Sequence, residues 1–292
     1  SRGRPPRLRL PRNAAAAARR YAFLGWEPKT RDAALALLRT GAAAAGGGAH
    51  VYVHGFNNTP QFAARTAALL AAAHGRAAAC FAWPSNPPLP RSWAIAAVLS
   101  VAERNYTAAE QQMQRSVSSL AACAARLREG LPASTKLQWT AHSMGCYLVL
   151  LATRERVDAS TFHRVVLLAP DVPTWFFVDA VKRAVRADVR FLHCFHKNDE
   201  AVEISRQRRG LDYPVPGQGA VLPRLPGLAA VDCSGASATM GNHDYGRIDA
   251  NCLAEGTAFL AGKRPDERPN LAASTDEPGV WVLRGAAEGK YI

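Results

Sequence analysis

Short apolar runs alternate along the chain with longer stretches in which apolar residues recur at every third or fourth position. The first pattern is typical of buried strands and the second of helices with one apolar face. Strands are predicted at residues 49–53, 77–83, 137–141, 164–169, 189–195 and 228–233, the last being the final strand. Helices are predicted at residues 30–40, 59–74, 92–129, 146–156, 174–187 and 247–261. This alternation predicts the α/β class, with a mainly parallel sheet and helices on both faces.

The helix expected at residues 59–74 has clear local signals. Thr59 can cap its start, and Pro60 suits the first helical position. One apolar face is expected from Phe62, Thr66, Leu69 and Leu70.

The segment LQWTAHSMG, residues 137–145, joins a strand pattern directly to a helix pattern through Ser143. This is the layout of a nucleophile elbow, in which a sharp turn exposes a Ser hydroxyl at the start of a helix. Ala141 stands where the usual G-x-S-x-G signature has its first Gly. The backbone N–H of Met144, directly after the Ser, would be one oxyanion donor.

Other chemically useful residues also follow predicted strands, at the edge where ligands of parallel sheets bind. The turn after residues 49–53 reads His54-Gly55-Phe56-Asn57, and Phe56 is the preferred second oxyanion donor over Asn57. Asp171 and Asp199 follow the next two strands after the elbow, and His243 follows the last one. The chain order predicts a triad of Ser143, Asp199 and His243, with Asp171 as the alternative acid, a helix cap or a pocket residue. The pocket is expected to include His54, Gly55, Asn57, His142 and Asp171.

These segments resemble the α/β-hydrolase superfamily, and within it a largely uncharacterised branch with HGFN and AHSMG motifs. The matching stretches are VYVHGFN (51–57), FAWPS (81–85), AHSMGCYLVLL (141–151), VVLLAPDV (165–172), NDEAVEIS (198–205), VDCS (231–234) and HDY (243–245). The resemblance implies a serine hydrolase that transfers the acyl group of a small-molecule ester to water. Such chemistry requires no cofactor and no metal.

The order of elements divides the chain into a basic arm (1–26), the α/β domain (27–261) and a C-terminal tail (262–292). Residues 84–106 begin with a Pro-rich loop and are predicted to lie over or beside the site as a lid segment. The arm and the tail, which contains a short apolar run at 280–283, are candidates for contact with a protein partner. A catalytically weak or inactive subunit of a larger, organellar assembly is therefore the alternative function.

The distribution of charge limits the kinds of partner that we expect for this chain. Of the net charge of +13, seven units come from arginines in residues 1–26, so the body is only mildly basic and no nucleic-acid partner is expected. The arm is either the remnant of an organellar targeting segment or a solvated arm that contacts an acidic partner.

None of the six cysteines forms a C-x-x-C pair, which favours a reducing compartment, cytoplasmic or organellar (mitochondrion or plastid). No apolar run approaches the ~20 residues of a transmembrane helix. His193 and His196 alternate across a strand, which argues against a metal pair.

Overall fold

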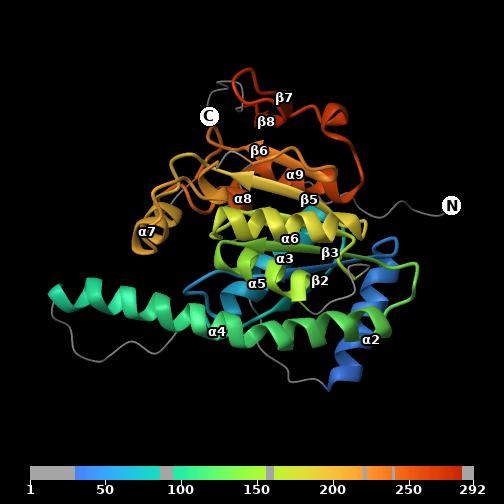
Figure 1. Ribbon diagram of the computed structural model, residues 1–292. Coiled ribbons are helices and arrows are strands. Elements are labelled where there is room, and N and C mark those ends of the chain that lie inside the picture. Colours follow the sequence, from blue (N-terminus) through green and yellow to red (C-terminus); the bar gives the residue numbers. More distant parts are fainter. Residues whose placement is uncertain (1–29, 86–94, 156–160, 220–221, 239–240, 285–292) are drawn as a thin grey trace, which may run out of the picture.

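The computed structural model describes residues 30–85, 95–155, 161–219, 222–238 and 241–284 (Figure 1). The predicted basic arm and residues 86–94 of the predicted lid segment lie outside these ranges. Within the described ranges, none of the helices combines the length and the apolar character needed to cross a bilayer.

The described strands form one sheet in the order β2-β1-β3-β4-β5-β6-β8-β7 (Figure 1). All neighbouring strands pair in parallel except β7 and β8, which are antiparallel. The mainly parallel α/β sheet predicted from the sequence is thus confirmed. The strands are β1 (Gly48–Val53), β2 (Ala77–Phe81), β3 (Lys136–His142), β4 (Arg164–Leu168), β5 (Arg190–Phe195), β6 (Leu228–Asp232), β7 (Leu271–Ala273) and β8 (Val280–Leu283).

The sheet continues beyond the strand that the sequence predicts to be the last. Strand β8 pairs in parallel with β6, and β7 then pairs with β8, so part of the predicted tail belongs to the sheet. Leu271 and Leu283 are buried with Phe259 and Leu260 in one apolar cluster. The prediction of residues 228–233 as the final strand is therefore wrong, because short strands in a Pro- and Gly-rich segment give only a weak periodic signal.

Helices cover both faces of the sheet, as predicted (Figure 1). One face carries α2 (Arg31–Ala44), α4 (Ile95–Gly130), α5 (Met144–Glu155) and α6 (Thr174–Arg186), whose apolar sides pack around the buried Trp139. The other face carries α3 (Pro60–His74), α8 (Tyr245–Ile248) and α9 (Ala250–Leu260). Helix α7 (Glu200–Arg208) and the projecting first half of α4 lie on the same side of the molecule, at the left of Figure 1. Short 3-10 turns occur at Pro216–Gln218 and Pro265–Glu267.

Helix α3 bears out its predicted start and corrects its predicted face. The hydroxyl of Thr59 accepts the Phe62 N–H at 3.2 Å, and Pro60 is the first helical residue. Leu69 and Leu70 are buried, but Phe62 is 45% exposed. The Arg247 guanidinium instead lies 5.3 Å from the centre of the Phe62 ring. A cation over the aromatic face therefore shields this side chain, which the core does not bury.

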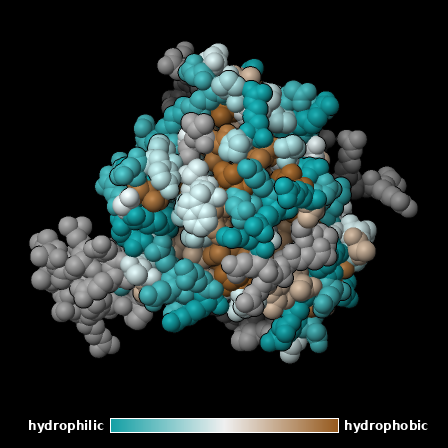
Figure 2. Space-filling view, in the orientation of Figure 1, coloured by the Kyte–Doolittle hydropathy of each residue, from teal (hydrophilic) through white to brown (hydrophobic). Residues whose placement is uncertain are grey.

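The surface seen in Figure 2 is mostly hydrophilic, with smaller apolar areas near the middle of this face. The exposed large apolar side chains of the described residues belong to different elements: Leu37, Phe62, Trp175, Ile204, Tyr213 and Val282. Exposed apolar residues scattered in this way are normal for a folded domain.

Candidate active site

Ser143 occupies a one-residue turn between a strand and a helix. Strand β3 ends at His142 and α5 begins at Met144. Ser143 has a φ of 55°, a left-handed conformation that few side chains adopt. Its N–H donates to Leu168 O at 2.9 Å, and its carbonyl accepts the Cys146 N–H at 2.9 Å. These bonds hold the turn in the geometry expected of a nucleophile elbow.

Two glycines allow the first strand's turn to approach Ser143 closely. A methyl group added at Gly145 would lie 2.7 Å from the carbonyl oxygen of Val53. One added at Gly55 would lie 2.8 Å from Ser143 Cβ and 3.0 Å from His142 O. Both contacts are too close for any side chain, so Gly is required at these positions.

Ala141, by contrast, lies where the sheet has room for a side chain. It lies on β3 beside Val53 of β1 and Leu167 of β4, and it is fully buried. Its methyl group is part of the apolar core cluster. The sheet therefore accommodates Ala where the common signature has Gly.

The turn that follows β1 lies beside the elbow, because the space between Gly55 and Ser143 leaves no room for a Cβ on Gly55. The next residue, Phe56, is half-buried. Asn57 is exposed, has a φ of 56° and donates its N–H to Ser85 O at 3.0 Å. Met144 is the first residue of α5, where backbone N–H groups lack acceptors within the helix. The two predicted oxyanion donors thus come from adjacent segments.

His54 lies in the same turn, but its ring is fully buried. It stacks on Trp83 with ring centres 5.5 Å apart, and its Nε2 accepts the Trp83 N–H at 3.1 Å. The proton is therefore on Nδ1, which donates to Gly55 O at 2.9 Å. Burial lowers the pKa of His54. The neutral imidazole thus acts as a support for the turn.

Asp199 and His243 form a close pair between the loops that follow β5 and β6. His243 Nδ1 lies 2.9 Å from Asp199 Oδ1 and 2.8 Å from Oδ2. Asp199 is fully buried, whereas 17% of the His243 side chain is exposed. Asp199 Oδ1 also accepts the Val202 N–H at 3.0 Å and so caps α7. A carboxylate on Nδ1 places the imidazole proton there, which leaves Nε2 as the basic nitrogen.

His142 joins the loop of His243 to the elbow. Its Nε2 donates to the carbonyl oxygen of His243 at 2.9 Å, and the two imidazole rings are 4.6 Å apart between centres. Burial, together with the nearby charges of Arg247 and His243, lowers the pKa of His142 well below its ordinary value. The residue preceding Ser143 is therefore a neutral donor that holds the His243 backbone beside the elbow.

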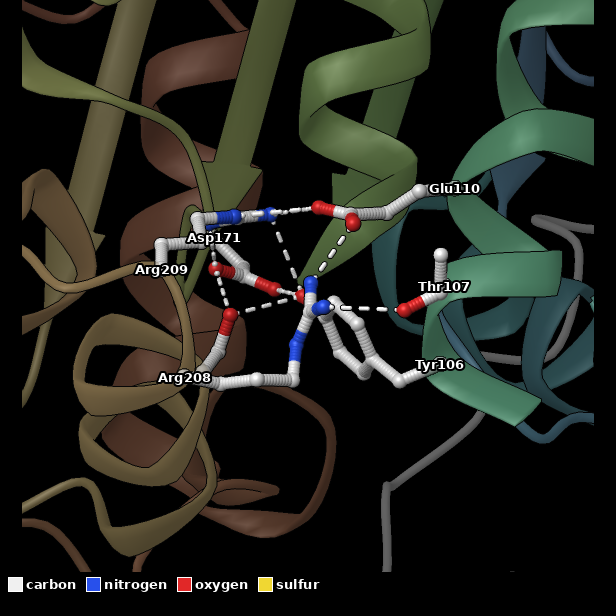
Figure 3. Close-up of polar contacts among 7 residues, drawn as sticks. Tyr106, Thr107, Glu110, Asp171, Arg208 and Arg209 are labelled. Atoms are coloured by element: carbon white, nitrogen blue, oxygen red, sulfur yellow. Dashed lines mark hydrogen bonds and ion pairs between the residues drawn. The ribbon is translucent and has the colours of Figure 1, made fainter. Parts of the chain in front are cut away.

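Asp171 lies next to the elbow, and its carboxylate is bound by residues of α4 and of the α7 segment (Figure 3). Its N–H donates to Ser143 O at 3.4 Å. Its carboxylate accepts Ser205 Oγ at 2.8 Å and Arg209 Nη1 at 2.6 Å, and it is also hydrogen-bonded to the Tyr106 hydroxyl. It does not cap α6, whose start has Pro173 at the cap position and no side-chain cap.

Three residues near the site were not singled out from the sequence: Tyr106, Arg209 and Tyr245. The buried Tyr245 hydroxyl accepts the Ala169 N–H at 3.0 Å and donates to Cys194 O at 2.8 Å, which ties the ends of β4 and β5 together. The only sequence signal for it was its place in the HDY segment. Tyr106 is the last residue of the predicted lid segment, but nothing in the sequence indicated a role for its hydroxyl, and Arg209 carried no signal.

Cys146 is a free thiol on α5, three residues after Ser143. It is fully buried, and its Sγ donates to Leu168 O at 3.4 Å. Burial raises the pKa of this thiol well above its ordinary value. Because the thiolate is the nucleophilic form, this environment is unfavourable for nucleophilic chemistry at Cys146.

Comparison with known proteins adds a family assignment to this geometry. A family model described as "Alpha/beta hydrolase of unknown function (DUF900)" matches residues 42–211. A solved structure of esterase B from Lactobacillus rhamnosis is similar over 57% of this chain at 14% identity, with a TM-score of 0.33. This chain spans 64% of that esterase's length. The comparison with curated proteins yields no match.

Proposed function

Because this chain belongs to the α/β-hydrolase family DUF900, we propose that it is a serine hydrolase that cleaves carboxylic esters. The observation that carries the proposal is the buried carboxylate–imidazole pair of Asp199 and His243, with Nδ1 and Oδ2 2.8 Å apart. His142 holds the backbone of His243 beside the strained turn of Ser143. A nucleophile, a base and a group that orients the base are the parts that acyl transfer requires.

In the proposed reaction, His243 Nε2 takes the hydroxyl proton of Ser143 while Oγ attacks the ester carbonyl carbon. The tetrahedral intermediate then collapses, and the imidazolium returns the proton to the leaving alcohol. Water attacks the resulting acyl-enzyme with His243 again as the base, which releases the carboxylic acid. Asp199 stays ionised throughout and stabilises the imidazolium.

The oxyanion of each tetrahedral intermediate is assigned to the N–H groups of Phe56 and Met144. The contact of Gly55 with Ser143 supports this, because it brings Phe56 next to the elbow. Removing one such donor costs about 3–4 kcal/mol of transition-state stabilisation in enzymes of this chemistry. The positive end of α5 adds to the stabilisation of the negative charge.

We propose that Ser85 and Tyr106, near the two ends of the predicted lid segment, border the proposed oxyanion site. Both residues contact the turn after β1. Ser85 Oγ accepts the Asn58 N–H at 3.2 Å, and the Tyr106 ring lies 5.2 Å from the Phe56 ring.

A fluorophosphonate probe tests this proposal, because it phosphonylates activated serines. We expect the purified chain to be labelled at one serine, and we expect Ser143→Ala to abolish labelling without loss of folded protein. Ser118→Ala, at an exposed position on α4, is the matched control and should label like the unmodified chain. A panel of p-nitrophenyl esters of increasing acyl length would then define the substrate. Equal labelling of the Ser143→Ala variant, or none of the folded unmodified chain, would contradict the proposal.

A further inference from the structure

The Tyr106 hydroxyl is the centre of a polar network that joins α4 to α7 beside the elbow (Figure 3). It is hydrogen-bonded to the Asp171 carboxylate, it lies 2.7 Å from Ser205 Oγ, and it accepts Arg209 Nη2 at 3.2 Å. These partners come from the loop after β4, from α7 and from the residue that ends α7. One phenol oxygen thus connects three segments that are distant in sequence.

Two arginines complete this network on the side of α4. Arg209 Nη2 donates to Glu110 Oε1 at 2.8 Å, and its Nη1 donates to Asp171 at 2.6 Å. Arg208 donates to Glu110 Oε2 at 2.6 Å and to Thr107 Oγ1 at 3.1 Å. The Arg208 guanidinium also lies over the Tyr106 ring, 4.1 Å from its centre. Helix α4 therefore binds both arginines through a carboxylate, a hydroxyl and an aromatic face.

The network is balanced in charge and shielded from solvent. It contains two carboxylates, Asp171 and Glu110, and two guanidinium groups. Only 12% of the Arg209 side chain and 2% of the Asp171 side chain are exposed. Burial alone would lower the pKa of Arg209, but the carboxylates of Asp171 and Glu110 outweigh it, so its pKa is raised. Arg208 Nε is buried without a hydrogen-bond partner, but the carboxylates and the other guanidinium nitrogens are paired, so the loss of one member leaves buried partners unpaired.

This network contacts the turn of Ser143 and the proposed oxyanion turn, and it lies at the far end of the helix that Asp199 caps. At the nucleophile, the Asp171 N–H donates to Ser143 O at 3.4 Å. At the oxyanion turn, the Tyr106 ring packs on Phe56, with ring centres 5.2 Å apart. At the acid, α7 bears Asp199 at its first end and the network residues at its last turn. A shift of α4 against α7 would therefore move the oxyanion turn and the acid together.

We propose that Tyr106 and Arg209 are positioning residues, which set the oxyanion turn and the acid-bearing helix relative to the nucleophile. This role rests on the proposed serine hydrolase activity and adds positioning residues to the proposed site. Neither side chain reaches the reacting atoms in this role. Because positioning acts mainly in the transition state, disturbing it should lower kcat and leave KM nearly unchanged.

Two conservative variants separate this role from simple stabilisation. Tyr106→Phe keeps the ring against Phe56 and Arg208 and removes only the hydroxyl. Arg209→Lys keeps the charge, but one ammonium cannot replace a fork that binds three acceptors. Tyr213→Phe, at a 42% exposed tyrosine, is the matched control. Each variant is titrated with fluorophosphonate, so that kcat is expressed per competent site, and a short-chain p-nitrophenyl ester is the substrate.

We expect kcat per titrated site to fall at least fivefold in Tyr106→Phe and Arg209→Lys, with KM within twofold of the unmodified chain. If each variant loses less than fivefold per competent site, and merely yields fewer competent sites or a lower Tm, the positioning role is refuted. Hydrogen exchange of the amides at residues 54–58 and 199–205 gives a readout that needs no activity. Faster exchange at both segments in Tyr106→Phe, but not in Tyr213→Phe, supports the inference even if the unmodified chain proves unreactive and the proposed function fails. Unchanged exchange in that case refutes it.

Discussion

Replacing Asp199 with Asn separates the two tasks of this carboxylate, the cap of α7 and the orientation of His243. In the structure, Oδ1 accepts the Val202 N–H at 3.0 Å, while Oδ2 lies 2.8 Å from His243 Nδ1. An Asn that keeps its oxygen on the Val202 N–H must turn its NH2 group toward His243 Nδ1. This arrangement favours the imidazole tautomer with its proton on Nε2, which cannot accept the proton of Ser143.

The expected magnitudes differ sharply for the two tasks. Asn and Asp are similarly good helix caps, so the free energy of unfolding should change by less than about 1 kcal/mol. The wrong tautomer in a triad lowers kcat by about 10⁴-fold, which corresponds to about 5.4 kcal/mol of activation free energy. Urea unfolding measures the first quantity, and ester hydrolysis at neutral pH measures the second.

Asp249→Asn is the matched control for this experiment. Asp249 caps α9 by accepting the Asn251 and Cys252 N–H groups at 2.8 and 3.0 Å. The same substitution at this cap should leave kcat unchanged. If Asp199→Asn retains more than a tenth of the activity of the unmodified chain, Asp199 does not orient the base, and the assignment of the triad acid is wrong.

Three further predictions concern stability and the shape of the elbow. Gly145→Ala should cost about 1–3 kcal/mol of unfolding free energy and should impair fluorophosphonate labelling, because the added methyl group would lie 2.7 Å from Val53 O; a variant as stable and as reactive as the unmodified chain would contradict this. Burial lowers the pKa of His74 and of His193 from 6.5 to about 4, so the unfolded chain takes up these protons first. The free energy of unfolding is therefore highest above pH 6.5 and falls by about 3 kcal/mol for each histidine as the pH is lowered to 4. Urea titrations that give equal stability at both pH values would refute this prediction. Thr59→Ala should cost about 1 kcal/mol through loss of the α3 cap, Thr59→Ser should restore most of it, and kcat should be unaffected in both.

The predicted site residues and the network residues differ in how they are encoded. Ser143, Asp199 and His243 each follow a strand in sequence, so the positions of the strands were enough to propose them together. Tyr106 and Arg209 are 103 residues apart and lie on helical segments whose apolar pattern gives no sign of contact between them. Their pairing depends on how α4 packs against α7, which is a property of the assembled fold. Periodicity along the chain therefore predicts layers and strand ends, but it does not predict contacts between helices.

The choice between Asp171 and Asp199 illustrates the same limit within the site itself. Both carboxylates follow neighbouring parallel strands and both are buried, so only the order of elements along the chain favoured Asp199 over Asp171. Their partners do. Asp171 binds a guanidinium and two hydroxyl groups, which hold its oxygens toward α4 and α7. Asp199 uses one oxygen partly for a backbone cap and presents both to the imidazole of His243. The hydrogen bonds of the Asp171 carboxylate are directed to Tyr106, Ser205 and Arg209, whereas Asp199 faces His243, and this difference favours Asp199 as the acid of the proposed triad.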